Sequence, residues 1–290
     1  MGKHLLIVLF FCILIWGPDQ ASAIGTVFTY RSPESATDKR YDYDNAVLRL
    51  ALEKTREEWG DYTLVPSPTM NISRAITLLE TEILENPMFK LSANNTLCSE
   101  LNFAPFPVDL GIVGHRLFFV SKNVDGKLSR VTTIDELKKF SIGQGYGWLD
   151  VEILTAAGFS VVLAPSYESL FRMVAVERFD LLSRGVNEVA MEYESHKDIP
   201  NFMLNAHIGL YYPLPRFFFT NKKSKGAARR VYEGLVKAYQ DGSLLNLWEQ
   251  QYRSSIAFGN IRNVKFFRID NPFIDEIDPS YKQFMLKVME

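Results

Sequence analysis

Short strand-like runs alternate with helix-like segments along most of the chain, and this alternation restricts the fold more than any other feature. The strand-like runs are rich in β-branched and aromatic residues, whereas the helix-like segments repeat apolar residues at helical spacing. Such an alternation predicts an α/β fold, in which helices cover sheets. The predicted strands are 26–30, 62–65, 116–121, 140–142, 159–163, 179–182 and 216–220. The predicted helices are 42–58, one capped by Ser73, a short one opened by the capping-box pair Thr133 and Glu136, and then 148–157, 167–176, 185–194, 227–239 and 244–252.

The first 23 residues have the organisation of a secretory signal peptide. A basic start at Lys3 leads into an apolar stretch at 5–16, and the small residues of 21–23 suit a cleavage site. A membrane anchor is the alternative, but a spanning helix needs roughly 20 apolar residues and this stretch is shorter. We therefore expect export, with a mature chain that begins at Ile24.

Charge and cysteine content exclude several classes of protein. The chain has a net charge of −2 and no basic stripe, so we expect no nucleic acid partner. Cys98 is the only cysteine of the expected mature chain, so no internal disulfide is possible there. The histidines after residue 23 (His115, His196 and His207) lack the spacing of zinc ligands, and we expect no metal or other cofactor.

Three stretches resemble the type II periplasmic solute-binding proteins, in particular the amino-acid-binding branch known as family 3. They are RLFFVSKNVDGKLSRVTTIDELKKFSIGQGYG, RMVAVERFDLLSRG and RFFFTNKKSKGAARRVYEGLVKAYQDGSLLNLWEQQY, of which the last, with its Asp-Gly-Ser joint, is the most specific. The resemblance covers 26–252. It implies a two-lobed periplasmic-binding-protein-like II fold, in which each lobe is a mixed sheet flanked by helices.

The resemblance also implies how the chain divides between the lobes. The first lobe would consist of 24–116 together with 216–290, and the second lobe of 117–215. The tail at 253–290 lies outside the resemblance, and its aromatic residues argue against disorder. We expect it to pack along the first lobe, with an extra strand at 264–269.

In this family the ligand lies in the cleft between the lobes, at strand ends and helix starts. The glycine-rich turn at 143–148 opens a helix, so its backbone N–H groups and the helix dipole would favour an anionic group. Gln144, Gly145 and Trp148 are the candidates from this turn. The alternative is a tight strand-to-helix turn that binds nothing.

Two positions depart from the amino-acid-binding pattern. Glu100 stands where the family places an arginine for the ligand carboxylate, and Arg184 or Gly185 stands where it places an aspartate for the ammonium. An arginine at a strand end suits a carboxylate or phosphate, so we expect Arg184 to hold an anionic group. The structural alternative is an ion pair with Glu188, one helical turn further on.

The first lobe would add candidates at the ends of its own elements. Tyr30 and Arg31 close the first strand, and Arg74 begins the helix after the second strand. Exposed residues of these types are also common on ordinary loops, so each is a weak candidate alone.

Binding is the function that these features predict, with catalysis as its rival. The chain has no G-x-S-x-G, H-E-x-x-H or P-loop signature. Glu100, Asp150 and Glu188 remain as acid/base candidates for a dehydratase-like enzyme on the same scaffold. We expect no enzyme, but a monomeric periplasmic protein that captures a small polar or anionic ligand, for an ABC-type permease or as the input of a membrane sensor.

Overall fold

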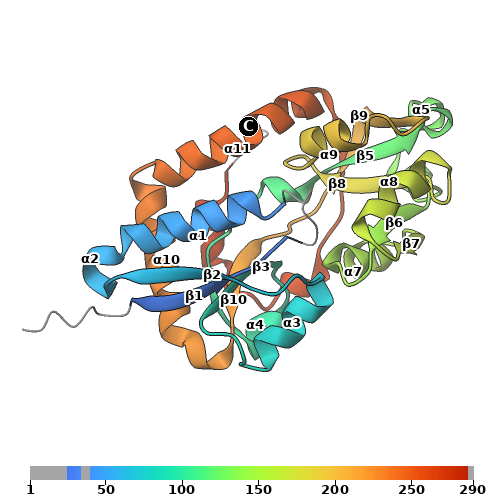
Figure 1. The fold of residues 1–290 in the computed structure, drawn as a ribbon. Helices are drawn as coiled ribbons and strands as arrows, with labels where there is room; N and C mark the ends of the chain where they lie inside the picture. The colour runs from blue at the N-terminus through green and yellow to red at the C-terminus, as the bar shows by residue number, and fades with distance from the viewer. Residues whose placement is uncertain (1–24, 34–39, 287–290) are drawn as a thin grey trace, which may run out of the picture.

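The computed structural model describes residues 25–33 and 40–286 of the 290. The predicted signal peptide lies outside these residues. Within these residues eleven strands form two sheets, each covered by helices, and the sheets lie side by side in two lobes (Figure 1). The predicted α/β class and the two-lobed arrangement of mixed sheets are confirmed.

The first lobe is built on a five-stranded sheet in the order β2-β1-β3-β10-β4. Strands β1, β2 and β3 run parallel, whereas β10 runs antiparallel to both β3 and β4. The strands are β1 Thr26–Tyr30, β2 Tyr62–Pro66, β3 Pro87–Ser92, β4 Asn102–Ala104 and β10 Arg216–Thr220. The helices named with them are α1 Asp42–Lys54, α2 Arg56–Trp59, α3 Ile72–Glu80, α4 Asn95–Glu100, α10 Lys225–Gln240 and α11 Ser243–Gly259.

Both faces of this sheet are covered, and the sequence of β10 reflects it. Side chains alternate between the two faces of a strand, so a strand that is apolar at consecutive positions must be buried on both sides. Phe218 belongs to the main core, whereas Phe217 and Phe219 belong to a second core that packs against α3 and α4. The main core also holds the contact of α1 with α10, where a Cβ on Gly234 would lie 2.0 Å from the Ala51 carbonyl oxygen. Only glycine fits that position.

The second lobe is built on a six-stranded sheet in the order β11-β9-β5-β8-β6-β7. Strands β6, β7 and β8 are parallel, and β5 is antiparallel to β8 and β9. The strands are β5 His115–Ser121, β6 Ile142–Gly145, β7 Val161–Ala164, β8 Leu181–Gly185, β9 Phe202–Tyr211 and β11 Lys265–Arg268. The helices are α5 Lys122–Leu128, α6 Ile134–Leu137, α7 Leu149–Ala156, α8 Tyr167–Ala175 and α9 Val189–His196. Short 3₁₀ turns complete the chain, namely η1 Ile112–Gly114, η2 Lys222–Ser224, η3 Ile261–Asn263, η4 Pro272–Ile274 and η5 Pro279–Phe284.

Several local predictions are corrected by the structure. The predicted helix 42–58 breaks at Thr55 into α1 and α2, and α3 is capped by the side chain of Asn71 instead of Ser73. The capping box of Thr133 and Glu136 is present as predicted. Strands β3, β4 and β9 and helices α4 and α5 were not predicted at all.

The C-terminal tail contacts both lobes, so the expectation that it packs along the first lobe is only partly right. The predicted strand at 264–269 exists as β11, but it pairs in parallel with β9 of the second lobe. Further along, Ile277 and Tyr281 are buried in the second core of the first lobe. The segment, red in Figure 1, thus passes from one lobe to the other.

Candidate functional site

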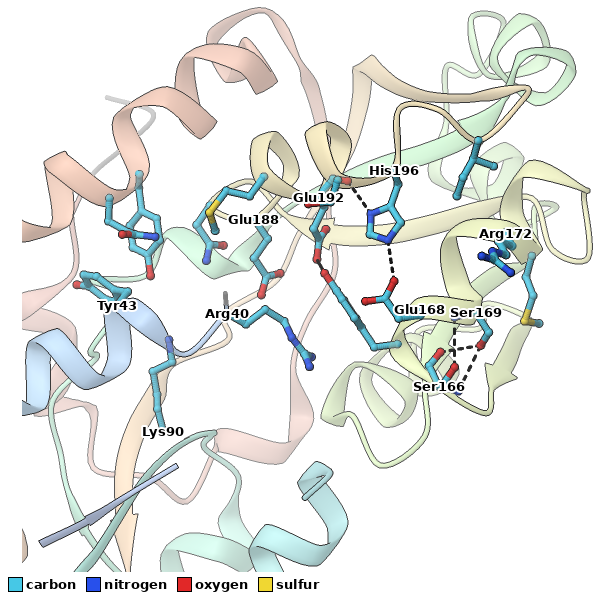
Figure 2. A pocket seen from close by; sticks show the side chains of 18 of the residues that line it. Arg40, Tyr43, Lys90, Ser166, Glu168, Ser169, Arg172, Glu188, Glu192 and His196 are labelled. Carbon is cyan, nitrogen blue, oxygen red and sulfur yellow. Dashed lines mark hydrogen bonds and ion pairs between the residues drawn. The ribbon is translucent and has the colours of Figure 1, made fainter. Parts of the chain in front are cut away.

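Two cavities lie between the lobes, and they meet at four shared side chains. The wide cavity, of about 830 Å³, lies between α8 and α9 of the second lobe and α1 and α11 of the first (Figure 2). The narrow cavity, of about 270 Å³, lies between α3 and α4 of the first lobe and the start of α7. The residues that line both are Arg40, Lys90, Glu188 and Arg216. We call this meeting point the junction.

Two opposite charges face each other across the junction. Arg216 opens β10 of the first lobe, and Glu188 directly precedes α9 of the second. Nη1 of Arg216 lies 3.8 Å from Oε1 of Glu188, which is beyond hydrogen-bond distance. Among the described residues this is the only ion pair of Arg216. The arginine is therefore held loosely and remains able to bind a further acceptor.

Glu188 is kept ionised by its surroundings. Burial opposes the charge, but arginines around the carboxylate, with Arg184 the strongest, outweigh burial and hold the pKa of Glu188 at about 2. Its Oε2 forms an ion pair with Nη2 of Arg184 at 2.9 Å and accepts a hydrogen bond from the backbone N–H of Gly185 at 3.3 Å. Glu188 therefore presents a permanent negative charge to the junction at any ordinary pH.

Arg184 is already engaged by carboxylates within its own lobe. Its Nε and Nη2 donate to Glu192 at 2.6–3.0 Å, in addition to the contact with Glu188. Its guanidinium also lies over the ring of Trp148, at 4.6 Å from the ring centroid. The ion pair with Glu188, weighed as the structural alternative for Arg184, is present. A free anion would have to compete with two built-in carboxylates for this arginine.

The first lobe carries its own buried charge cluster at the junction. Lys90, in the middle of β3, is ion-paired with Asp44 and, at 2.9 Å, with Asp109. The hydroxyl of Tyr252 also donates to Asp109, at 2.9 Å. Burial raises the pKa of Asp44 to about 6, in spite of the neighbouring Lys90. This cluster fixes the floor of the cleft beside Arg216.

Three of the eight candidate residues from the sequence line the narrow cavity: Arg31, Trp148 and Arg184. The start of α7 joins them through Gly147 and Asp150, so the turn predicted to face a ligand does reach the cleft. Asp150 is bound there by Nη2 of Arg116, at 2.8 Å. The anion-attracting start of this helix therefore already carries a negative charge.

The other five candidates do not line either cavity. Gln144 is buried and donates to the Ser183 carbonyl at 3.4 Å, and Gly145 gives room to the indole of Trp148, which a Cβ would approach to 2.5 Å. Gly185 lies behind Glu188, Tyr30 is half-buried at the end of β1, and Arg74 is exposed on α3.

Glu100, the first departure from the amino-acid-binding pattern, is exposed at the end of α4 and lines neither cavity. The polar residues that reach the narrow cavity from that segment are Ser92, Asn94 and Thr96. This segment therefore contributes uncharged polar side chains to the cleft where the family has an arginine. Glu100 does not place a carboxylate there.

Sequence reasoning did not propose Arg216 for the site, although a signal for it exists. Arg216 is the one charged residue of an otherwise apolar strand, RFFFT, and it stands where the chain returns to the first lobe. A charge that opens a fully buried strand at a lobe crossing must face the interlobe space, because the rest of the strand is covered.

Solved structures with the same fold were found by comparison of the whole architecture. An ancestral arginine-binding protein, solved with arginine bound, matches with a TM-score of 0.59 over 79% of this chain and 99% of its own, at 12% identity. The chain has the fold of a type II periplasmic solute-binding protein. A periplasmic binding protein of Salmonella typhimurium, described for its high arginine specificity, matches with a TM-score of 0.58 at 13% identity, over 79% of this chain and 100% of its own. No family model and no curated protein matches the sequence.

A third structure of this fold bears on the enzyme alternative. It is an ancestral amino-acid-binding protein described as a precursor of cyclohexadienyl dehydratase. It matches with a TM-score of 0.57 at 12% identity, over 79% of this chain and 95% of its own. The solute-binding-protein fold thus includes a binder from which a catalyst descends.

Within the described residues no helix is both long and apolar enough to cross a membrane.

Proposed function

We propose that this chain is an exported solute-binding protein that captures a small zwitterionic solute between its two lobes. The observation that carries the proposal is the loose pair of Arg216 and Glu188, which face each other from opposite lobes. A ligand carboxylate bound to Arg216 and a ligand ammonium bound to Glu188 would replace one 3.8 Å contact with two close ones. The bound solute would then link the two lobes.

The charge pattern supports a zwitterion better than a simple anion. The candidate arginine of the second lobe, Arg184, is matched by Glu188 and Glu192, so that wall does not offer a free positive charge to an anion. The first lobe offers the cation and the second lobe the anion. This is the polarity that the resemblance implies for amino-acid binders, supplied here by Arg216 and Glu188 instead of the family's residues.

The proposal extends to location and partners. The predicted signal peptide and the fold favour a protein outside the cytoplasm, in the periplasm of a Gram-negative cell. Structures of this fold include the substrate-binding protein of an amino acid ABC transporter, so we infer an ABC-type permease as the partner, with a membrane sensor as the other possibility. We infer a monomer and no nucleic acid partner.

The geometry of the site gives little support to the alternative function, dehydratase-like catalysis. A general acid or base works best with a pKa near the operating pH. The pKa of Glu188 is about 2, Asp150 is paired with Arg116, and Glu100 lies outside both cavities. These three carboxylates fit an electrostatic role in the cleft better than proton transfer.

A thermal-shift screen tests the proposed function. Because a ligand stabilises the folded state by mass action, a solute at 100 times its Kd adds about 2.7 kcal/mol of stability. We expect at least one zwitterionic solute in a panel of amino acids, betaines and short peptides to raise the Tm. Matched monocarboxylates and amines that carry only one of the two charges should shift the Tm much less.

The variant Arg216→Gln tests the assigned residue. Hydrogen bonds to charged groups contribute about 1.5–3 kcal/mol, so R216Q should weaken binding of the best solute by roughly 10- to 150-fold by calorimetry. Arg253→Gln is the matched control, since Arg253 is exposed on α11 and lines neither cavity. The proposal fails if no solute raises the Tm, or if R216Q and R253Q bind equally well.

A further inference from the structure

The floor of the cleft in the first lobe holds a cluster of four buried charges. Lys90 and Arg216 supply the positive charges, and Asp44 and Asp109 supply the negative ones. The two cations stand two positions apart in the ladder of β3 and β10, so their side chains leave the same face of the sheet. In Figure 2 the ammonium end of Lys90 points towards Tyr43 of α1, the helix that carries Asp44. We call these four residues the floor cluster, and their charges balance.

The two carboxylates of the floor cluster are not held equally. Oδ1 of Asp109 accepts from Lys90 and from the hydroxyl of Tyr252, both at 2.9 Å. Oδ1 of Asp44 is buried, and within the described residues the ion pair with Lys90 is its only polar contact. Burial, together with the charge of Asp109, raises the pKa of Asp44 to about 6, against the effect of Lys90. Asp44 is therefore the less firmly held carboxylate.

A solute carboxylate at Arg216 would upset the charge balance of the floor cluster. Asp44, Lys90 and Arg216 line the same narrow cavity, so the incoming carboxylate would be a third negative charge beside two positive ones. The ammonium of the solute lies on the other side of the junction, at Glu188, and compensates that residue instead. A buried carboxylate without enough opposite charge takes up a proton more readily than it stays ionised.

The other charged and titratable groups around Asp44 do not absorb the surplus. They are Tyr43, Lys90, Asp109, Arg216 and Tyr252, with Arg40 and Glu188 at the junction. Burial raises the pKa of both tyrosines, so they stay neutral. Against the effect of burial, the two aspartates raise the pKa of Lys90, so it stays charged. Arg40 lies over the ring of Tyr167 in the second lobe, at 4.1 Å, where its charge acts on Glu188.

We propose that solute binding is coupled to the uptake of one proton by Asp44, so that the protein binds its solute more tightly at mildly acidic than at alkaline pH. This inference rests on the proposed function, because it places the solute carboxylate at Arg216. The proton comes from the solvent and stays on the Asp44 carboxyl group while the solute is bound. No bond of the solute is broken, and release of the solute returns the proton.

Affinity should fall as the pH rises. Below about pH 6 Asp44 already carries the proton in the free protein, so binding takes up none and the Kd is constant. Above that pH the proton is bound only in the complex. The Kd should then rise by up to about tenfold per pH unit, until the pH exceeds the pKa of Asp44 in the complex.

Calorimetry in two buffers measures the proton directly. The standard amino acids and glycine betaine are titrated into the protein at about pH 7.5, in phosphate and in Tris, which differ in their heat of ionisation. For each solute that binds, the difference between the two heats gives the number of protons taken up. We expect a value close to one, together with a Kd that rises between about pH 6 and pH 8.

Two matched variants assign the proton to its residue. Asp44→Asn has the shape of the protonated side chain without its charge. It should bind with no proton uptake and keep the wild-type Kd of about pH 6 up to pH 8. Asp42→Asn is the control, because Asp42 is exposed on the same helix and lines neither cavity. It should retain both the proton uptake and the pH dependence of the wild type.

The outcomes separate this inference from the proposed function. Solute binding without proton uptake in the wild type, or proton uptake that persists in D44N, would overturn the coupling and leave the solute-binding proposal standing. If D44N does not fold, the wild-type titrations in the two buffers still decide whether a proton is bound. A failure of every zwitterion to bind would remove both proposals.

Discussion

At the scale of single residues, some buried ionisable groups of this chain are paired with opposite charges in the cleft, whereas the pKa of others is shifted mainly by burial. Glu188 and Arg184 belong to the first kind, because each is matched by opposite charges at close range. His115 belongs to the second kind. It lies 8% exposed in β5, between the rings of Tyr211 and Phe266, and burial lowers its pKa to about 4.

The pKa of His115 predicts a pH dependence of stability. Above pH 6.5 the histidine is neutral in both states, so no stability is lost. As the pH falls from 6.5 towards 4, the unfolded chain binds a proton that the folded protein excludes, so the folded state should lose up to roughly 3 kcal/mol. His115→Phe should remove this loss, as measured by urea unfolding between pH 7 and 4.5.

The control for this prediction is His207→Gln, because His207 lies in the same sheet but is exposed. Carboxylates titrate equally in all three proteins and therefore cancel in the comparison. Identical pH slopes for the wild type and H115F would contradict the assigned role of burial.

At the scale of elements, the C-terminal segment stands out because it ties the two lobes together outside the crossings expected from the resemblance. Strand β11 extends the second sheet beside β9, and the next residues return to the first lobe. Asn95, at the start of α4, donates to Asp275 at 2.6 Å, and the N–H of Leu286 donates to the Leu110 carbonyl at 3.0 Å. If the lobes move apart, this segment must either be strained or bend as a hinge between them.

Tyr281 is the anchor of this segment in the first lobe, and its removal should destabilise the protein. It is 1% exposed and its ring packs edge-on against Phe217, with 5.3 Å between the centroids. Truncation of a buried aromatic residue typically costs about 3–5 kcal/mol, so Tyr281→Ala should lower the free energy of unfolding by about 3 kcal/mol. Lys282→Ala, at the exposed neighbouring position, should change it by less than about 0.5 kcal/mol. A loss that small for Y281A in urea unfolding would show that the tail contributes little to the fold.

Element prediction from the sequence succeeded where the pattern is local and failed where distant partners decide. The runs at 26–30 and 216–220 were predicted to the residue, because β-branched and aromatic residues fill them. Strand β3 was missed because Lys90 interrupts it, and a lysine is buried there only through Asp44 and Asp109 from other parts of the chain.

Strand β9, the longest of the described strands, was missed for a similar reason. Asn205 interrupts its apolar pattern near a shift of register between β5 and β9. Its amide is satisfied by Asp125 and by the backbone N–H groups of His207 and Ile208. Contacts of this kind are set by the tertiary fold and leave no periodic signal in the sequence.

At the scale of the whole molecule, the two-lobed scaffold was predictable but the electrostatics of its cleft were not. The resemblance placed Arg184 correctly at a strand end beside the cleft. It could not show that Glu192, eight residues further on, would bind that guanidinium, nor that Arg216 would face Glu188 from the other lobe. The polarity of the site is a property of the two lobes brought together, which no single segment encodes.

The most direct test of the central claim is a crystal structure of the protein with the solute that raises its Tm most. We expect density for the solute at the junction between the lobes, with its carboxylate within hydrogen-bond distance of Arg216 and its ammonium within hydrogen-bond distance of Glu188. A solute bound outside the interlobe cleft, or one that touches neither residue, would contradict the account.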